Sequence, residues 1–152
     1  MKAGESIFVV VRYSEIDGFD AASEIDKILS VHGRAWFAKF GQPLSQKLLA
    51  RFKSENTPTF LMLVTRERRG GYRRQSYEVK RLRFKRPNDG VPFPEYYAPQ
   101  LRAARTCLQV VSYVGPTVSL GELVTTSSGQ GIDESLRSSW RGHFLCNLRP
   151  GN

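Results

Sequence analysis

Residues 57–86 read TPTFLMLVTRERRGGYRRQSYEVKRLRFKR and predict two strands joined by a loop of arginines and glycines. The first strand has apolar residues on both faces, because successive side chains of a strand point to opposite sides of a sheet. These residues are Phe60, Met62 and Val64 on one face, and Leu61 and Leu63 on the other. A strand that is apolar on both faces is typical of the middle of a sheet.

The second strand of this stretch changes its alternation halfway. Its apolar positions are Tyr77 and Val79, followed by Leu82 and Phe84. The pattern therefore slips by one residue at Lys80 and Arg81, which predicts a β-bulge.

The loop between the two strands combines a glycine pair with many cations. Gly70 and Gly71 can adopt a positive φ, so they predict a tight turn. From residue 66 to residue 86 the chain has ten Lys or Arg against two Glu. Such a run either forms a solvated hairpin that keeps a sheet edge from aggregating or binds phosphates, and we favour the second interpretation. The candidate phosphate-binding residues are Arg66, Arg68, Arg69, Arg73, Arg74, Lys80, Arg81, Arg83, Lys85 and Arg86.

Length and composition fit a single globular domain over residues 1–152. A chain of 152 residues can bury roughly two thirds of its unfolded surface without disulfides or metals. Its apolar share of 40%, with 11% aromatic residues, argues against disorder despite the net charge of +9. We expect most of the chain to be folded.

The positive charge is concentrated in the middle of the chain. Residues 34–105 hold seventeen basic and five acidic side chains, whereas residues 1–33 hold three basic and six acidic ones. A concentrated excess of this kind attracts polyanions, so nucleic acid, either RNA or DNA, is the first candidate partner. No membrane partner is expected, because the sequence shows no basic amphipathic helix, no lipidation signal and no segment of transmembrane length.

Cys107 and Cys146 each lie in an apolar, strand-like run. Cysteines in such runs are usually small buried hydrophobic residues, and together with His32 and His143 they form no zinc-binding spacing. The N-terminal segment lacks the long apolar region and cleavage site of a signal peptide. We therefore expect a reduced, cytoplasmic protein with no metal and no cofactor.

The remaining pattern predicts an α+β fold. Strands are expected at residues 6–13, 34–40, 106–114 and 143–148, helices at residues 20–30 and 43–53, and a single turn of helix near residues 133–137. Asp20 is the expected N-cap of the first helix, and Gly33 should end the connection that follows it. Three prolines in residues 87–94 predict an extended loop. Ser119 and Glu122 have the spacing of a capping box.

The sequence carries no recognisable catalytic motif, since it has no P-loop, no GxGxxG after a strand, no HExxH and no GxSxG. His143, near Ser139 and Arg141, could act as a base in a metal-free ribonuclease, but a single histidine at the start of a strand is more often structural. We therefore expect no catalytic residue. A small, toxin-like RNA-cleaving protein remains the main alternative, and a domain that binds an acidic protein partner is the second.

Several aromatic residues lie beside the basic middle of the chain, namely Trp36, Phe37, Tyr96 and Tyr97. Binding of an unstacked base needs flat aromatic faces, a few polar groups, and cations outside for the phosphates. Each of these residues can instead belong to the core, so only their convergence in space would indicate a pocket.

The segments YSEIDGFD (13–20) and RAWFAKFG (34–41), followed by the strand–turn–strand and a proline-rich loop ending in two tyrosines, resemble the PUA-like superfamily, which contains the EVE and ASCH domains. The resemblance covers most of the chain. It implies a small mixed β pseudo-barrel with two flanking helices, and a nucleic-acid-binding role that in several members includes a pocket for a modified base. The positions that match pocket walls are Tyr13, Ser14, Asp17, Trp36, Lys39, Tyr96 and Tyr97.

Together these observations predict a non-enzymatic nucleic-acid-binding module. The basic hairpin would hold phosphates and supply affinity, while the aromatic pocket would accept a modified or flipped base and supply selectivity.

Overall fold

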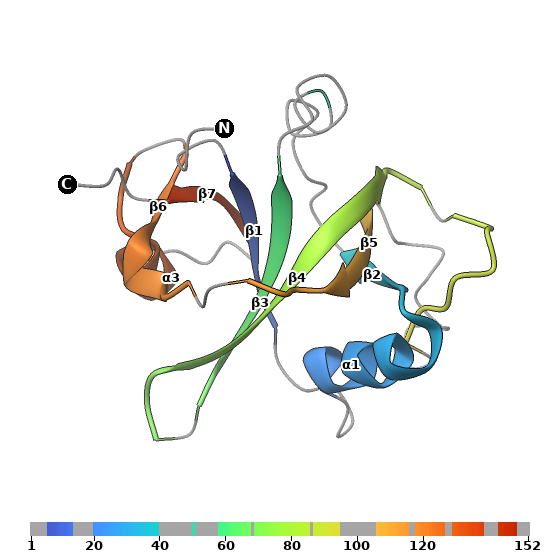
Figure 1. Ribbon diagram of the computed structural model, residues 1–152. Coiled ribbons are helices and arrows are strands. Elements are labelled where there is room, and N and C mark those ends of the chain that lie inside the picture. The colour runs from blue at the N-terminus through green and yellow to red at the C-terminus, as the bar shows by residue number, and fades with distance from the viewer. Residues whose placement is uncertain are drawn as a thin grey trace.

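The computed structural model describes residues 6–13, 20–39, 50, 58–67, 69–85, 87–94, 106–115, 118–126, 129–138 and 143–148 (Figure 1). The elements follow one another as β1 (Ile7–Arg12), α1 (Ala21–His32), β2 (Ala35–Lys39), β3 (Thr59–Arg66), β4 (Tyr72–Arg83), β5 (Thr106–Ser112), the 3-10 turn η3 (Leu120–Glu122), β6 (Leu123–Thr125), α3 (Ile132–Ser138) and β7 (His143–Leu148).

The strands form one mixed, seven-stranded sheet in the order β2-β5-β4-β3-β1-β7-β6. β1 and β3 are parallel, and the other neighbouring strands are antiparallel. The expected α+β class is therefore confirmed. The described sheet has β2 and β6 as its two edges, so these strands do not close into a barrel.

Two hydrophobic cores lie on opposite faces of this sheet, because β1 and β3 are apolar on both sides. One core receives Ile7, Val9 and Val11 of β1 with Leu61 and Leu63 of β3. The other receives Phe8 and Val10 with Met62 and Val64. Figure 1 shows α1 beside the half of the sheet that contains β2, and α3 beside the half that contains β6. The prediction that β3 is a central strand is confirmed.

The hairpin of β3 and β4 follows the sequence pattern closely. Its turn has Gly70 at φ 89° and Gly71 at φ 79°, a conformation that glycine adopts without strain. The register between β4 and β5 shifts between Val79 and Arg81. This shift is the predicted β-bulge, and it lets Leu82 join the same core as Val79.

α1 begins where the sequence predicts and ends at His32 rather than at about residue 30. The Asp20 side chain accepts a hydrogen bond from Ser23 N at 3.0 Å, and Gly33 ends the helix at φ 74°. Ile25 and Leu29 bury the inner face of α1, each contributing about 1.5–3 kcal/mol through burial. The hydroxyl of Tyr77 in β4 reaches the same helix, lying 2.9 Å from Asp26 Oδ1 and 3.1 Å from Ala22 O.

The C-terminal third adds one element that the sequence did not reveal. β6 has only three residues and pairs with β7, so its alternation is too short to recognise. The expected turn of helix at Ser119 is present as η3, although the Ser119 hydroxyl donates to Glu122 Oε1 rather than accepting from a backbone N–H.

The expected helix at residues 43–53 lies outside the described residues, apart from residue 50. Within the described ranges, no helix is long and apolar enough to cross a membrane.

Candidate nucleic-acid interface

The basic hairpin exposes most of its described cations to solvent. Arg66, Arg69, Arg73, Lys80, Arg81, Arg83 and Lys85 are exposed, and Arg74 is half-buried. Arg68 and Arg86 lie outside the described residues. A charged strand of this kind attracts polyanions over a distance set by ionic strength.

Arg73 and Arg74 lie in β4, and each contacts another part of the fold. Arg73 Nη2 donates to Asp20 Oδ1 at 3.0 Å, at the start of α1. Arg74 Nε donates to the carbonyl oxygen of Val118 at 3.1 Å. Neighbouring residues of a strand point to opposite faces, so the two guanidinium groups make their contacts on different sides of the sheet.

The Asp20–Arg73 contact also includes Tyr13, one of the expected pocket residues. Burial and a hydrogen bond to Asp20 raise the pKa of Tyr13 to about 12, so its hydroxyl remains protonated at neutral pH. Burial works to raise the pKa of Asp20, but hydrogen bonds from Tyr13 and Ser23 and the charge of Arg73 outweigh it and lower that pKa. This network connects β1, α1 and β4.

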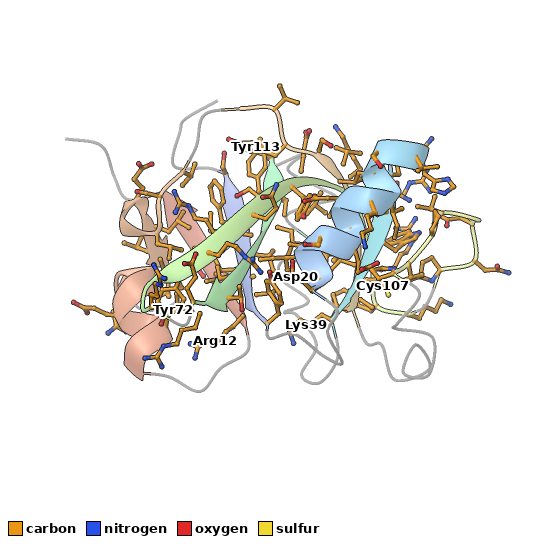
Figure 2. The ribbon with its side chains drawn as sticks, turned by 90° about the horizontal axis from the view of Figure 1, so that it is seen from below. Arg12, Asp20, Lys39, Tyr72, Cys107 and Tyr113 are labelled. Carbon is orange, nitrogen blue, oxygen red and sulfur yellow. The ribbon has the colours of Figure 1, made fainter. Side chains whose placement is uncertain are left out.

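A groove of about 500 Å³ lies along the first half of β4. We call it the β4 groove, and its lining residues are Tyr72, Arg73, Arg74, Gln75, Ser76, Tyr113, Gly115 and Val118. β5 ends at Ser112 opposite Tyr77, so Tyr113 leaves the strand beside Ser76. Figure 2 shows Tyr72 and Tyr113 well apart, with β4 running between them. The groove thus has an aromatic residue near each end and basic and polar side chains between them.

The ring of Tyr113 is held by contacts on its own side of the sheet. It meets Phe60 edge-on with ring centroids 5.2 Å apart, and Phe60 stacks on Phe8 at 5.1 Å. Such aromatic pairs contribute about 0.5–1.5 kcal/mol each beyond the area that they bury. A Cβ at Gly115 would lie 2.7 Å from Cζ and Oη of Tyr113, so the ring lies directly over this glycine.

Trp36 belongs to the core, which corrects its assignment to a pocket wall. The side chain is only 1% exposed. Its Nε1 donates to Asp89 Oδ1 at 3.0 Å, and its ring stacks on Phe93 with centroids 6.2 Å apart. The loop of residues 87–94 therefore covers the indole ring and leaves no face for a base.

Lys39 does not share a site with Trp36. β2 pairs with β5 in an unbroken register from Ala35 to Lys39, so Trp36 and Lys39 point to opposite faces of a regular strand. Lys39 is 6% exposed, and burial lowers the pKa of its amine. The other expected pocket residues, Ser14, Asp17, Tyr96 and Tyr97, lie outside the described residues.

The residues that sequence reasoning considered for chemistry do not form a site in the described part of the chain. Cys107 and Cys146 are buried, as predicted, and burial raises the pKa of Cys146 to about 12. The side chain of His143 lies outside the described residues, although its backbone pairs with Val11. A thiol that stays protonated at neutral pH is a poor nucleophile.

Sequence reasoning missed the aromatic residues of the β4 groove. Tyr72 follows the glycine pair inside the basic run, so its position among arginines was an available signal. Tyr113 was recognised only as a strand residue, and its approach to β4 depends on how β5 pairs with β4. Spacing along the chain carries no information about that pairing.

Comparisons with models of protein families, with curated proteins and with solved structures give no match for this chain. Its function therefore has to be inferred from the chemistry of the β4 groove and of the strand that forms it.

Proposed function

We propose that this protein is a non-enzymatic nucleic-acid-binding module that uses the β4 groove. The observation that carries this proposal is that Tyr72, Arg74 and Tyr113 line one groove beside the basic strand β4. Aromatic faces for bases beside cations for phosphates are the two components that such binding needs.

The phosphate contacts would come from the exposed cations of β3, β4 and the turn between them. Arg66 and Arg69 lie at the turn and Arg81 lies past the bulge, so the charge extends beyond the groove in both directions. Contacts to phosphates fix the position of a nucleic acid without reading its sequence. Selectivity would come from Gln75, Ser76 and the tyrosine rings inside the groove.

Kinship with the PUA-like superfamily is part of this proposal. The mixed sheet with helices beside different parts of it is compatible with this kinship, whereas the described strands do not close into the implied pseudo-barrel. The resemblance also suggested a pocket for a modified base. Because Trp36 is buried, we assign the binding of a modified base to the β4 groove instead of to β2.

A second function, binding of an acidic protein partner, is favoured by the exposed cations but not by the tyrosines of the groove. The basic surface alone would serve either partner. An RNA-cleaving activity has no observation in its favour among the described side chains, and it would require His143. Loss of RNA cleavage on replacing His143 by alanine, with the fold retained, would establish the cleaving alternative.

The proposal is tested by measuring the affinity for fluorescein-labelled RNA and DNA over a range of salt concentrations. Each neutralised phosphate releases condensed counterion, so with about five contacts log K should fall with log salt at a slope of roughly −3.5 to −4.5. Binding that is insensitive to salt, or no binding to any nucleic acid, would contradict the proposal.

A charge variant locates the binding surface. Arg66→Gln with Arg69→Gln should reduce the magnitude of the salt slope by about 1.4–1.8 and leave the melting temperature unchanged, because both side chains are exposed. Lys27→Gln is the control for one charge, since Lys27 is 73% exposed on α1. Half of the double variant's effect in Lys27→Gln would show attraction by net charge alone.

A further inference from the structure

Five consecutive residues of β4 line the β4 groove, which bears on the form of nucleic acid that it can hold. Residues 72–76 line its length, and four residue steps of a strand span roughly 13 Å. Tyr72 lies at one end, and Tyr113 lies beside Ser76 at the other. A groove of this length accommodates more than a single base.

The charges beside the groove are arranged for one phosphate backbone. Both arginines line the groove, but Arg74 is fixed by its contact with Val118, whereas the guanidinium of Arg73 is held on the α1 side by Asp20. A duplex stacks its bases inside and presents two rows of phosphates, so the two tyrosines would contribute little to binding it. An unpaired strand offers its base faces to the tyrosines and its single backbone to Arg74.

Resting on the nucleic-acid-binding function proposed above, we infer that the β4 groove holds an unpaired strand with one base stacked on Tyr113, and that Gly115 sets the position of this ring. Gly115 is a positioning residue, since it has no side chain of its own to offer the ligand.

The role of Gly115 follows from the space around it. A Cβ added there would meet Cζ and Oη of Tyr113 at 2.7 Å, a distance that requires one of the groups to move. Tyr113 Oη is the far end of a side chain that can rotate, so the ring would move while the backbone stays in place. Alanine at position 115 should therefore displace the ring at little cost to the fold.

Gly121 provides a matched control. A Cβ added at Gly121 meets no atom within 4 Å, and this glycine lies in η3, outside the groove. Neither Gly115 nor Gly121 is among the glycines with positive φ, so alanine is compatible with the backbone at both positions. The two variants make the same chemical change with different consequences for Tyr113.

The experiment measures fluorescence anisotropy with an oligothymidylate of about 15 nucleotides, with the oligouridylate of the same length, and with the oligothymidylate annealed to its complement. We expect the wild-type protein to bind the single strands more tightly than the duplex at the same salt concentration. Gly115→Ala should weaken single-strand binding at least about fivefold, within the range of 5- to 150-fold for one lost stacking contact. Gly121→Ala should change it by less than about twofold.

The outcomes separate this inference from the proposal on which it rests. Failure of all three probes to bind would overturn the nucleic-acid function itself. Equal or tighter binding of the duplex would overturn only the choice of an unpaired strand. Wild-type affinity in Gly115→Ala, with an unchanged melting temperature, would remove Tyr113 from the site. Tyr113→Ala serves as a second variant, and its loss of affinity should equal or exceed that of Gly115→Ala.

Discussion

Replacing Asp89 by alanine should destabilise the protein, although Asp89 itself is exposed. Its carboxylate accepts hydrogen bonds from Trp36 Nε1 at 3.0 Å and from Val91 N at 3.1 Å, and Gln109 Nε2 lies 3.4 Å from its second oxygen. Trp36 and Gln109 are each only 1% exposed. A buried donor that loses its acceptor costs about 1–3 kcal/mol.

The expected loss for Asp89→Ala is about 1–3 kcal/mol in total rather than for each donor. The loop is exposed at residue 89, so water can enter where the carboxylate was removed and satisfy one of the donors. Urea denaturation followed by tryptophan fluorescence measures this loss. The midpoint should fall while the dependence on urea concentration stays the same.

The effect should also depend on pH. Burial works to raise the pKa of Asp89, but the hydrogen bonds from Trp36 and Val91 and the nearby charge of Arg81 outweigh it and lower that pKa. A carboxyl whose folded pKa is lowered stabilises the fold fully above its ordinary pKa of 3.8, and this contribution is lost as pH falls through the lower folded value. The difference between wild type and Asp89→Ala should therefore shrink in acid.

Two further variants control this prediction. Asp89→Asn keeps an acceptor oxygen for Trp36 but removes the charge, so it should lie between wild type and Asp89→Ala. In a Trp36→Phe background, Asp89→Ala should cost less, because the donor is already gone. An undiminished cost in that background, or an unchanged urea midpoint for Asp89→Ala, would refute the role of the Trp36–Asp89 hydrogen bond.

Two other predictions concern α1. Tyr77→Phe removes the hydroxyl that reaches Asp26 and Ala22 and should cost about 1 kcal/mol; thermal denaturation checks this, and an unchanged melting temperature would speak against the contact. Asp20→Ala removes the N-cap and the partner of Arg73 and should cost about 1–2 kcal/mol. Because the pKa of Asp20 is lowered in the fold, this cost should be full above pH 3.8 and shrink as pH falls below it. Asp20→Asn, which keeps a capping oxygen, should show less of both effects.

Local patterns predicted much of the fold. The bulge after Val79, the glycine turn, and the start of α1 all follow from residues close together in the sequence. The order of the strands does not, because pairing between β1 and β3 or between β4 and β5 depends on which apolar faces meet in the compact chain. The open sheet and the three-residue β6 are consequences of that pairing.

The candidate site was predictable in its charge but not in its aromatic component. Every Lys and Arg of the hairpin could be read from the sequence, whereas the assignment of Trp36 to a pocket was wrong. RAWFAKF is apolar on both faces, and such a strand is covered on both sides; here residues 87–94 provide the cover over Trp36. Tyr113 lines the groove because β5 pairs with β4 and because Gly115, which has no side chain, leaves room for the tyrosine ring.

The central claim is that nucleic acid binds along the β4 groove, and chemical-shift mapping of backbone amides tests it most directly. A 15N-labelled sample is titrated with the oligothymidylate at low salt. We expect the largest shifts at residues 72–76, 113 and 115, with smaller shifts at Arg66 and Arg69 and little change along the exposed face of α1. Shifts confined to α1 or to the loop of residues 87–94, with the amides of residues 72–76 unmoved, would contradict it.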